Sequence, residues 1–252
     1  MEILLYDGSF EGFLCAVFHA YENRYSSVDI QTAGKVQPGF FGSVHHINTE
    51  EDKAKRVLTG LEKRVSVTAL KQVHVAFLSE LPDIENTIFE FIRYAFKSNR
   101  RVECDFSNPS VLQVKDIARK VQREKHRMEA FIRFQLTNDG IYYAICQPDY
   151  NVLPLIEEHF KKRYADQRWL IYDAIRKYGL YYDLESVQTI QLSFNEACRQ
   201  GLDVTEVYEE NESVYQELWK HYFKSVNIAA RKNTKLHIQH MPKRYWKWLT
   251  EK

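Results

Sequence analysis

The strongest local signal in this chain is the tetrapeptide Thr137-Asn138-Asp139-Gly140, which separates two runs rich in aromatic and β-branched residues. The first run extends from Glu129 to Leu136 and the second from Ile141 to Gln147. A turn of this composition between two such runs is among the most reliable short-range signatures of a β-hairpin. We therefore expect the chain to be organised around a hairpin, from which a sheet is built.

The stretch after the hairpin, up to Asp183, continues the pattern of a sheet with a helix packed on one face. The turn residues Pro148 to Asn151 lead into a helix through Leu155, Ile156 and Phe160. Apolar and aromatic runs then predict strands at Trp169 to Tyr172, at Gly179 to Tyr182 and at Val187 to Leu192. The order hairpin, helix, hairpin predicts an antiparallel central sheet and the α+β class.

The N-terminal half is predicted to be mainly helical after a short initial strand from Ile3 to Tyr6. Asp7-Gly8-Ser9 follows that strand and is either a turn with a helix cap or a site for an anion at a helix N-terminus. His45, His46 and His74 have no carboxylate or cysteine at a metal-binding spacing, so we expect no metal site. The regions predicted from the sequence are residues 1–109, mainly helical; 110–200, the sheet platform; and 201–252, an acidic and then basic helical segment. We expect them to form one compact unit.

A helix predicted from Ser110 to about Glu129 carries a basic stripe. Its positively charged residues recur at helical spacing opposite an apolar stripe, and between Lys115 and Arg133 seven Lys or Arg stand against three acids. Such a face binds phosphates in some proteins and is simply solvated in others, and the pattern leaves both open. The candidate phosphate-contacting residues on this helix are Arg119, Arg123, His126 and Arg127.

The C-terminal basic segment, defined here as Trp219 to Lys252, contains nine Lys or Arg and one acid, with histidines and aromatic residues interleaved. Six acids and no Lys or Arg lie just before it, between Asp203 and Glu217. The lysines and arginines would attract phosphates and the rings would stack on bases, or the segment would dock back on the protein and bury its rings. The candidate residues are Lys235, His237, His240, Lys243, Arg244, Tyr245 and Trp246.

Composition excludes several classes of protein. Lys and Arg total 35 against 34 Asp and Glu, which argues against a protein that coats nucleic acid through a general positive charge. The apolar fraction of 44% is sufficient for a core, and no apolar run approaches the roughly 20 residues of a membrane span. The four cysteines are far apart, which is typical of reduced cytoplasmic thiols. We expect a cytoplasmic protein without a cofactor or a membrane partner.

Many tyrosines fall in the predicted sheet, where adjacent ones must point to opposite faces. One member of each pair Tyr142/Tyr143 and Tyr181/Tyr182 should therefore lie outside the helix-covered core. Exposed rings could stack on bases, but the β-propensity of tyrosine explains them without any ligand and is the preferred interpretation. A competing hypothesis is an enzyme acting on a nucleic-acid base in a pocket of the platform, although the sequence identifies no catalyst. That pocket would be lined by Tyr143, His159, Asp166 and Tyr172.

Several long strings resemble one known family across essentially the whole chain. They are YDGSFEGFL, HRMEAFIRF, DGIYYA, PDYNVLPL, HFKKRYADQRWLIYD and KLHIQHMPKRYWKWL. They are similar to proteins of DNA repair or DNA metabolism that accompany a radical-SAM partner, some of which are fused to uracil-DNA-glycosylase-like domains. The chain lacks the CxxxCxxC motif of radical-SAM enzymes, so the resemblance implies an accessory role with DNA. The aromatic residues favour single-stranded or damaged DNA as the ligand. A third hypothesis is a protein-interaction adaptor whose basic segment contacts an acidic partner.

Overall fold

The computed structural model describes residues 1–33, 43–137, 140–191 and 241–249 of the chain. The chain divides into two compact units, Met1–Gln122 (unit 1) and Arg123–Lys252 (unit 2), each with helices and a β-sheet. The expected α+β class is confirmed, with a helix-rich first half and a central sheet. The division falls within helix α5 (Pro109–Phe131), whose first turns bury Val111 and Val114, whereas the sequence suggests a boundary ahead of that helix.

Unit 1 has a small parallel sheet with helices packed around it. Its strand order is β2-β1-β3, and β1 pairs in parallel with both neighbours. The expected initial strand forms β1, and the helices that follow account for most of the unit. The elements of unit 1 are β1 (Glu2–Tyr6), α1 (Phe10–Glu22), β2 (Val28–Thr32), β3 (Ser43–His46), α2 (Glu51–Glu62), α3 (Val67–Phe77), α4 (Ile84–Lys97) and the first part of α5.

Local capping and apolar periodicity explain where helix α1 begins and which face it buries. Ser9 is the N-cap, and its Oγ accepts a hydrogen bond from the Gly12 N–H at 2.9 Å. Phe13 and Val17 on the apolar face are fully buried. The core also contains a polar link, in which the Tyr6 hydroxyl of β1 donates to Glu85 of α4 at 3.0 Å. This contact ties the central strand to α4 within the core.

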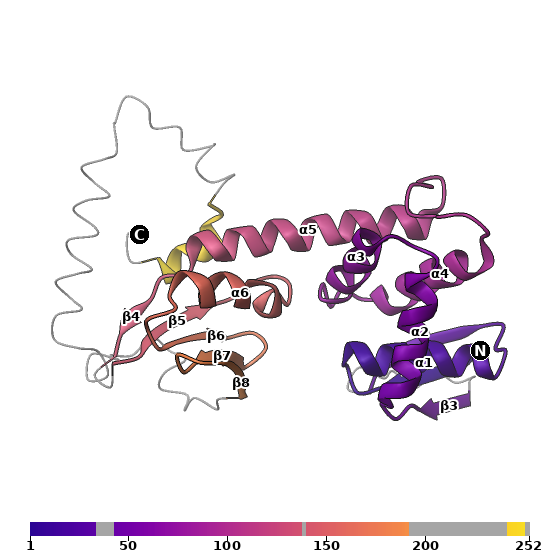
Figure 1. Ribbon diagram of the computed structural model, residues 1–252, viewed down its shortest axis with the longest axis horizontal. Coiled ribbons are helices and arrows are strands. Elements are labelled where there is room, and N and C mark those ends of the chain that lie inside the picture. Colours follow the sequence, from indigo (N-terminus) through magenta and orange to yellow (C-terminus); the bar gives the residue numbers. More distant parts are fainter. Residues whose placement is uncertain (34–42, 138–139, 192–240, 250–252) are drawn as a thin grey trace. The chain divides into compact units, whose positions relative to one another are not determined.

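Unit 2 is built on a five-stranded sheet with strand order β4-β5-β6-β7-β8. Helix α6 lies over one face of this sheet, and the end of α5 lies beside it (Figure 1). The elements of unit 2 are the last part of α5, β4 (Gln135–Leu136), β5 (Tyr142–Cys146), α6 (Leu153–Arg163), β6 (Trp169–Asp173), β7 (Tyr178–Tyr182), β8 (Val187–Gln191) and the 3-10 helix η2 (Lys243–Trp248).

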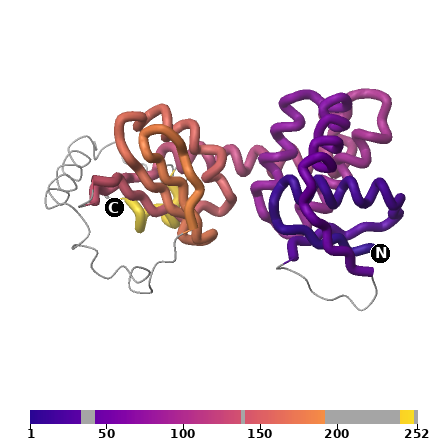
Figure 2. Tube along the Cα trace, turned by 60° about the horizontal axis from the view of Figure 1, so that its bottom comes forward, coloured from indigo at the N-terminus to yellow at the C-terminus, as the bar shows by residue number. Residues whose placement is uncertain are grey.

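The sheet of unit 2 is mixed, which corrects the expectation of a wholly antiparallel sheet. Strands β5 and β6 run parallel, with Tyr142 opposite Trp169 and Cys146 opposite Asp173. The other three pairings are antiparallel, and the turns between β6, β7 and β8 can be followed in orange in Figure 2. The reason is the connection: a helix between two neighbouring strands carries the chain back to the starting edge, so the second strand runs in the same direction.

The hairpin predicted at Thr137 forms, but its first strand is shorter than expected. Helix α5 continues to Phe131, so β4 contains only Gln135 and Leu136. Thr137 Oγ1 donates to the carbonyl of Ile141 at 2.8 Å, and Gly140 has a φ of +74°, a conformation that glycine adopts without strain. The turn residues 138–139 lie outside the described residues.

The sheet face toward α6 carries the core of unit 2. Trp169 is fully buried and meets Phe160 of α6 edge to face, with ring centroids 6.2 Å apart. Tyr182 is opposite Trp169 in the register and is 3% exposed, whereas the adjacent Tyr181 is half-buried. This pair shows the division between faces that the alternation predicts. In the other pair, both Tyr142 and Tyr143 are half-buried.

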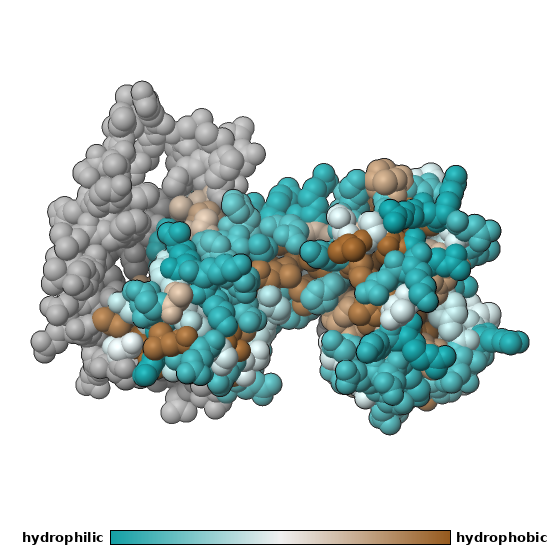
Figure 3. Space-filling model, in the orientation of Figure 1, coloured by the Kyte–Doolittle hydropathy of each residue, from teal (hydrophilic) through white to brown (hydrophobic). Residues whose placement is uncertain are grey.

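The C-terminal segment is described over residues 241–249, where η2 forms, and the predicted acidic segment lies outside the described residues. Among the helices that the structure describes, none is long and apolar enough to cross a membrane. Hydrophilic residues cover most of the coloured surface in Figure 3, and hydrophobic residues appear there in small patches.

Candidate functional site

Two loops of unit 2 follow the parallel strands β5 and β6 at the edge where both strands end. The first contains Pro148, which ends β5 because proline has no N–H to donate to a neighbouring strand. The second runs from Ala174 to Lys177 and turns the chain into β7. Ligands of sheets with parallel strands bind outside the carboxyl ends of those strands. This edge is therefore the first place in unit 2 where a functional site is expected.

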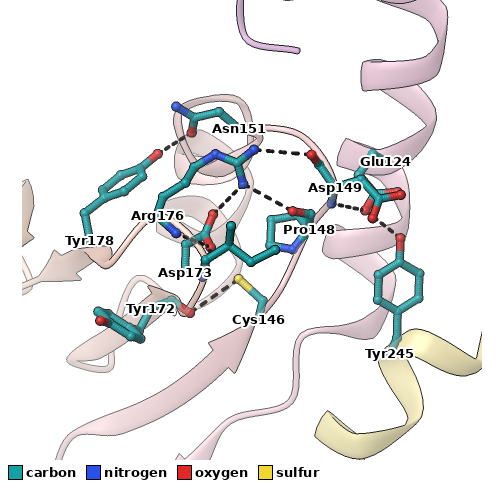
Figure 4. Close-up of polar contacts among 11 residues, drawn as sticks. Glu124, Cys146, Pro148, Asp149, Asn151, Tyr172, Asp173, Arg176, Tyr178 and Tyr245 are labelled. Carbon is teal, nitrogen blue, oxygen red and sulfur yellow. Dashed lines mark hydrogen bonds and ion pairs between the residues drawn. The ribbon is translucent and has the colours of Figure 1, made fainter. Parts of the chain in front are cut away.

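Glu124 of α5 is the centre of a hydrogen-bonded network at this edge (Figure 4). Its side chain is 1% exposed. The carboxylate accepts hydrogen bonds from the Tyr245 hydroxyl at 2.5 Å, from Arg244 Nη2 at 3.0 Å and from the Asp149 N–H at 3.0 Å. A buried carboxylate requires such partners, since an unpaired buried charge is strongly destabilising. The network joins α5, the loop after β5 and η2.

Arg244 and Tyr245 strengthen this connection through contacts of their own. Arg244 Nη2 lies 2.7 Å from Asp149 Oδ2 and also donates to the Tyr245 hydroxyl. Burial, together with the hydrogen bond to Glu124, raises the pKa of the Tyr245 hydroxyl well above its ordinary value. The hydroxyl therefore remains protonated at neutral pH and donates to the carboxylate. Helix η2 is docked on α5 by a charged and a neutral hydrogen bond at once.

Asp173 and Arg176 form a second network on the other side of the loop after β5 (Figure 4). Asp173 is fully buried and accepts hydrogen bonds from the Ile175 N–H at 2.8 Å and from Arg176 Nη1 at 3.0 Å. The Arg176 guanidinium also donates to the carbonyls of Pro148 at 3.2 Å and Asp149 at 3.3 Å. Charged groups from both sides thus hold the backbone of this loop in place.

Cys146 ends β5 beside Asp173, but its thiol is not an activated nucleophile. The residue is buried and its Sγ donates to the Tyr172 carbonyl at 3.5 Å. Burial, and after it the Asp173 carboxylate, raises the pKa of the Cys146 thiol well above its ordinary value. Because the thiolate is the reactive form, this environment makes the thiol inert.

The charged groups at this edge hold loops and helix η2 in position. Both buried carboxylates have a guanidinium partner, whereas Lys243 and Lys247 of η2 are exposed. The Nζ atom of Lys243 lies 5.9 Å from the ring centroid of Trp246, and that of Lys247 lies 4.6 Å from the ring centroid of Trp248. The network therefore holds a basic segment with two tryptophans beside the end of α5, an arrangement suited to an anionic partner with flat apolar groups.

The four basic residues predicted on α5 differ in how far they are already paired. Arg119 (unit 1), His126 and Arg127 (both unit 2) lie 3.0, 3.7 and 3.5 Å, respectively, from carboxylates of the same helix. Arg123 is exposed, and within the described residues no carboxylate lies at ion-pair distance from it. His126 is 87% exposed, so its interaction is weak. Arg123 is consequently the guanidinium of this helix that is most available to a ligand.

The predicted residues of the C-terminal basic segment are partly docked and partly exposed. Tyr245 is 3% exposed and its ring packs against Phe131 at a centroid distance of 5.8 Å, so it has no exposed face for a base. For this residue, the structure shows the alternative in which the segment docks back on the protein and buries its rings. Lys243 is exposed and Trp246 is half-buried, with its indole N–H donating to the Met241 carbonyl at 3.0 Å. Outside the described residues lie Lys235, His237 and His240.

The four residues of the hypothetical platform pocket are not brought together. The register places Tyr143 and Tyr172 on the sheet face opposite to Trp169, whereas Trp169 faces α6. His159 belongs to α6 itself, and Asp166 is exposed in the turn that follows that helix. The sheet therefore separates the two tyrosines from the other two residues.

In unit 1, the turn Asp7-Gly8-Ser9 is a cap and not an empty anion site. The Asp7 carboxylate accepts hydrogen bonds from the Ser9 N–H at 2.9 Å, from Ser9 Oγ at 2.6 Å and from Thr49 Oγ1 at 2.8 Å. Partial burial acts to raise the pKa of Asp7, but these hydrogen bonds outweigh it and hold the pKa below its ordinary value. This carboxylate occupies the position that an external anion would need.

Two of the predicted histidines of unit 1 have structural partners, whereas His46 is exposed. His45 Nε2 lies 2.8 Å from Glu2 Oε2, and the His74 ring packs edge-on against Phe10 at 4.9 Å. In the part of the chain that the structure describes, no three side chains of His, Cys, Asp or Glu are arranged to hold a metal ion.

Sequence reasoning did not identify Glu124 or Arg176 as part of a site. A signal for Glu124 existed, because it interrupts the apolar stripe of α5 between Val121 and Met128, where a side chain must be buried. No local signal identifies its partners, since Arg244 is 120 positions further along the chain.

Comparison with known proteins gives one family and no curated relative. Residues 82–251 match the model of a family described as a domain of unknown function, DUF4130. This match spans more than half of the chain and includes both networks of unit 2. The search of curated proteins found no match. On this evidence, the chain belongs to the DUF4130 family.

Proposed function

We propose that this protein binds DNA through unit 2, as an accessory to a radical-SAM enzyme in DNA repair or DNA metabolism. The observation that carries the proposal is the docking of η2 beside the end of α5, which gathers cations from segments 120 positions apart. Arg123, Lys243 and Lys247 are exposed, and within the described residues none has a carboxylate at ion-pair distance. These three residues define the basic surface of unit 2.

Exposed cations without acidic partners are the groups that a phosphate backbone recruits, because each contact releases condensed counterions. Arg244 docks η2 on the carboxylate of Glu124, and Arg127 pairs with the same carboxylate within α5, so both charges are already used inside the protein. We therefore assign the principal phosphate contacts to Arg123 and Lys243.

The tryptophans of η2 support a preference for single-stranded or damaged DNA. Trp246 and Trp248 are half-buried and lie beside Lys243 and Lys247. Stacking of an aromatic side chain on an unpaired base contributes about 1 to 3 kcal/mol, and intact duplex offers no such base face. A surface that combines lysine and tryptophan therefore favours strands whose bases are accessible.

Fluorescence anisotropy with labelled single-stranded and duplex oligonucleotides, over a salt series, tests the proposal. We expect affinity to fall steeply with salt and to be higher for the single strand. The double variant R123E/K243E should bind at least about tenfold more weakly, because two phosphate contacts become repulsive. K55E on α2 of unit 1, an exposed lysine outside this surface, is the matched control. Absence of binding at low salt, or an equal loss in the control, would overturn the assignment.

The partnership with a radical-SAM enzyme is supported by the resemblance of the long sequence strings. Co-expression with such an enzyme and affinity purification, with and without nuclease, tests it. Retention after nuclease treatment indicates direct contact, as the adaptor hypothesis also requires, whereas loss on treatment indicates joint binding to DNA. Failure to co-purify under both conditions would exclude the partnership and leave DNA binding to be judged by anisotropy.

A further inference from the structure

Unit 1 contains a groove of about 810 Å³ between α4, the first turns of α5 and Tyr21 of α1. We propose that this groove binds a nucleotide, that is, a planar base with one phosphate group, either free or as part of a single-stranded chain. The proposal does not depend on the basic surface of unit 2. The volume lies within the range of small-molecule sites, about 300 to 1,000 Å³.

An exposed aromatic ring forms one wall of the groove. Tyr21 is 42% exposed, and its ring is braced edge-on by Phe96 at a centroid distance of 5.5 Å and by Phe89 at 6.3 Å. A ring held in this way has already lost most of its rotational freedom, so a base that stacks on it pays little additional entropy. Tyr21 is thus suited to take the base of a nucleotide.

Cations at the groove are suited to a single phosphate. Arg93 and Lys97 line it, and the sequence from Arg93 to Arg101 contains four Lys or Arg and no acid. Arg93 pairs with Glu90 at 2.8 Å, whereas within the described residues Lys97 has no carboxylate at ion-pair distance. Two carboxylates, Asp83 and Glu90, also line the groove and balance the formal charge of Arg93 and Lys97, so the groove favours one phosphate over a triphosphate.

Two polar side chains of the lining remain available to the edge of a base. Asn86 is occupied, since its Nδ2 donates to Asp29 and Asp83, both at 2.8 Å. Within the described residues, the side chains of Gln113 and Thr87 make no hydrogen bond. An amide and a hydroxyl supply both donors and acceptors, the groups that base edges pair with.

Isothermal calorimetry of the full chain with nucleoside monophosphates, and in parallel with a short single-stranded oligonucleotide, tests this inference. We expect Y21A and K97Q each to weaken binding about tenfold, since one removes the stacking ring and the other the unpaired cation. Y21F keeps the ring and should bind like the wild type, which separates stacking from a folding defect. K55Q on α2 is the control for K97Q.

The possible outcomes separate the sources and the sites. Binding of monophosphates that responds to Y21A and K97Q supports a site for free nucleotides. Binding of the oligonucleotide alone, with the same response, supports a site for a nucleotide within a strand. Absence of both, or binding that Y21A and K97Q leave unchanged, would overturn the groove. Binding of monophosphates that R123E/K243E abolishes would assign them to unit 2 and also overturn it.

Discussion

Both units bury a tyrosine–glutamate hydrogen bond that joins distant segments, but the two bonds join different kinds of element. One joins a core strand to a helix, and the other joins a C-terminal segment to a helix. In unit 1, Tyr6 of the central strand donates to Glu85 of α4 at 3.0 Å, across 79 positions. In unit 2, Tyr245 of η2 donates to Glu124 of α5 at 2.5 Å, across 121 positions. Arg244 adds a charged hydrogen bond to the second pair, and the first has no such partner among the described contacts.

The difference shows how one polar contact serves packing in one place and surface construction in another. The Tyr6–Glu85 bond sets a strand against a helix within the core. The Tyr245–Glu124 bond instead attaches a segment whose exposed residues include Lys243 and Lys247. Loss of the first should loosen a core, whereas loss of the second should release a basic surface.

Removing the two carboxylates in turn should give the largest difference in stability between the two units. E124A should lower the free energy of unfolding by about 3 kcal/mol, because a guanidinium, a hydroxyl and a backbone N–H lose their acceptor. E85A should cost about 1 to 2 kcal/mol, since one hydroxyl is left unpaired. All four tryptophans follow Gln122, so in urea titrations tryptophan fluorescence reports unit 2 and far-ultraviolet circular dichroism reports both units.

The control for E124A is D116A, which removes an exposed ion pair from the same helix and should cost less than about 0.5 kcal/mol. Equal shifts of the fluorescence transition in E124A and E85A would contradict the separation into two units.

Removing only the hydroxyl groups should have a smaller effect. Y6F and Y245F should each cost about 1 kcal/mol, because the ring packing remains and one hydrogen bond is lost. Y245F should shift the unfolding transition seen by tryptophan fluorescence. Y6F should shift the transition seen by circular dichroism and leave the fluorescence transition unchanged. A cost in Y245F as large as that of E124A would show that the hydroxyl, and not the charge of Arg244, docks η2.

Replacing Arg244 by lysine sharpens the division between docking and DNA contact. R244K keeps the charge but loses the shared contacts with Glu124 and Asp149, so we expect about 0.5 to 1 kcal/mol in stability. The affinity for single-stranded DNA, measured by fluorescence anisotropy, should change by less than about twofold, because this charge interacts with the protein's own carboxylates. A tenfold loss of affinity without a loss of stability would instead make Arg244 a phosphate contact.

The contribution of the two tyrosine hydroxyls to stability should depend on pH only in alkali. Burial, followed by the neighbouring glutamate, raises the pKa of both Tyr6 and Tyr245. Their contribution is fully present below the ordinary tyrosine pKa of about 10 and is lost as pH rises above it, because the unfolded chain ionises first. Urea midpoints at about pH 8 and about pH 11 should show this loss, and Y6F/Y245F should reduce it. An equal loss of stability at alkaline pH in the wild type and in Y6F/Y245F would refute the assignment of this pH dependence to the two tyrosines.

Local patterns predicted the elements that depend on neighbours in the chain. Thr137 and Gly140 identified the hairpin, and Ser9 identified the start of α1, because turns and caps need particular residues at particular positions. The basic stripe of α5 was likewise predicted from helical spacing, and Arg123 is exposed as that spacing requires. DNA as its ligand remains a proposal.

The direction of β6 and the role of Glu124 could not be predicted in this way. An apolar strand has the same pattern whether its neighbour is parallel or antiparallel, so Trp169 to Tyr172 gave no indication of direction. Glu124 counted in the sequence as one acid on a basic helix, and its burial depends on the loop at Asp149 and on η2.

The sequence by itself determined the class of fold, the hairpin, the amphipathic helices and the concentration of charge in two segments. Only the tertiary structure decided that Tyr245 is buried against Glu124 while Lys243 remains exposed. The physical reason is distance along the chain. Periodicity and turn chemistry act over a few residues, whereas the partners of a buried carboxylate are chosen by the packing of every element between them.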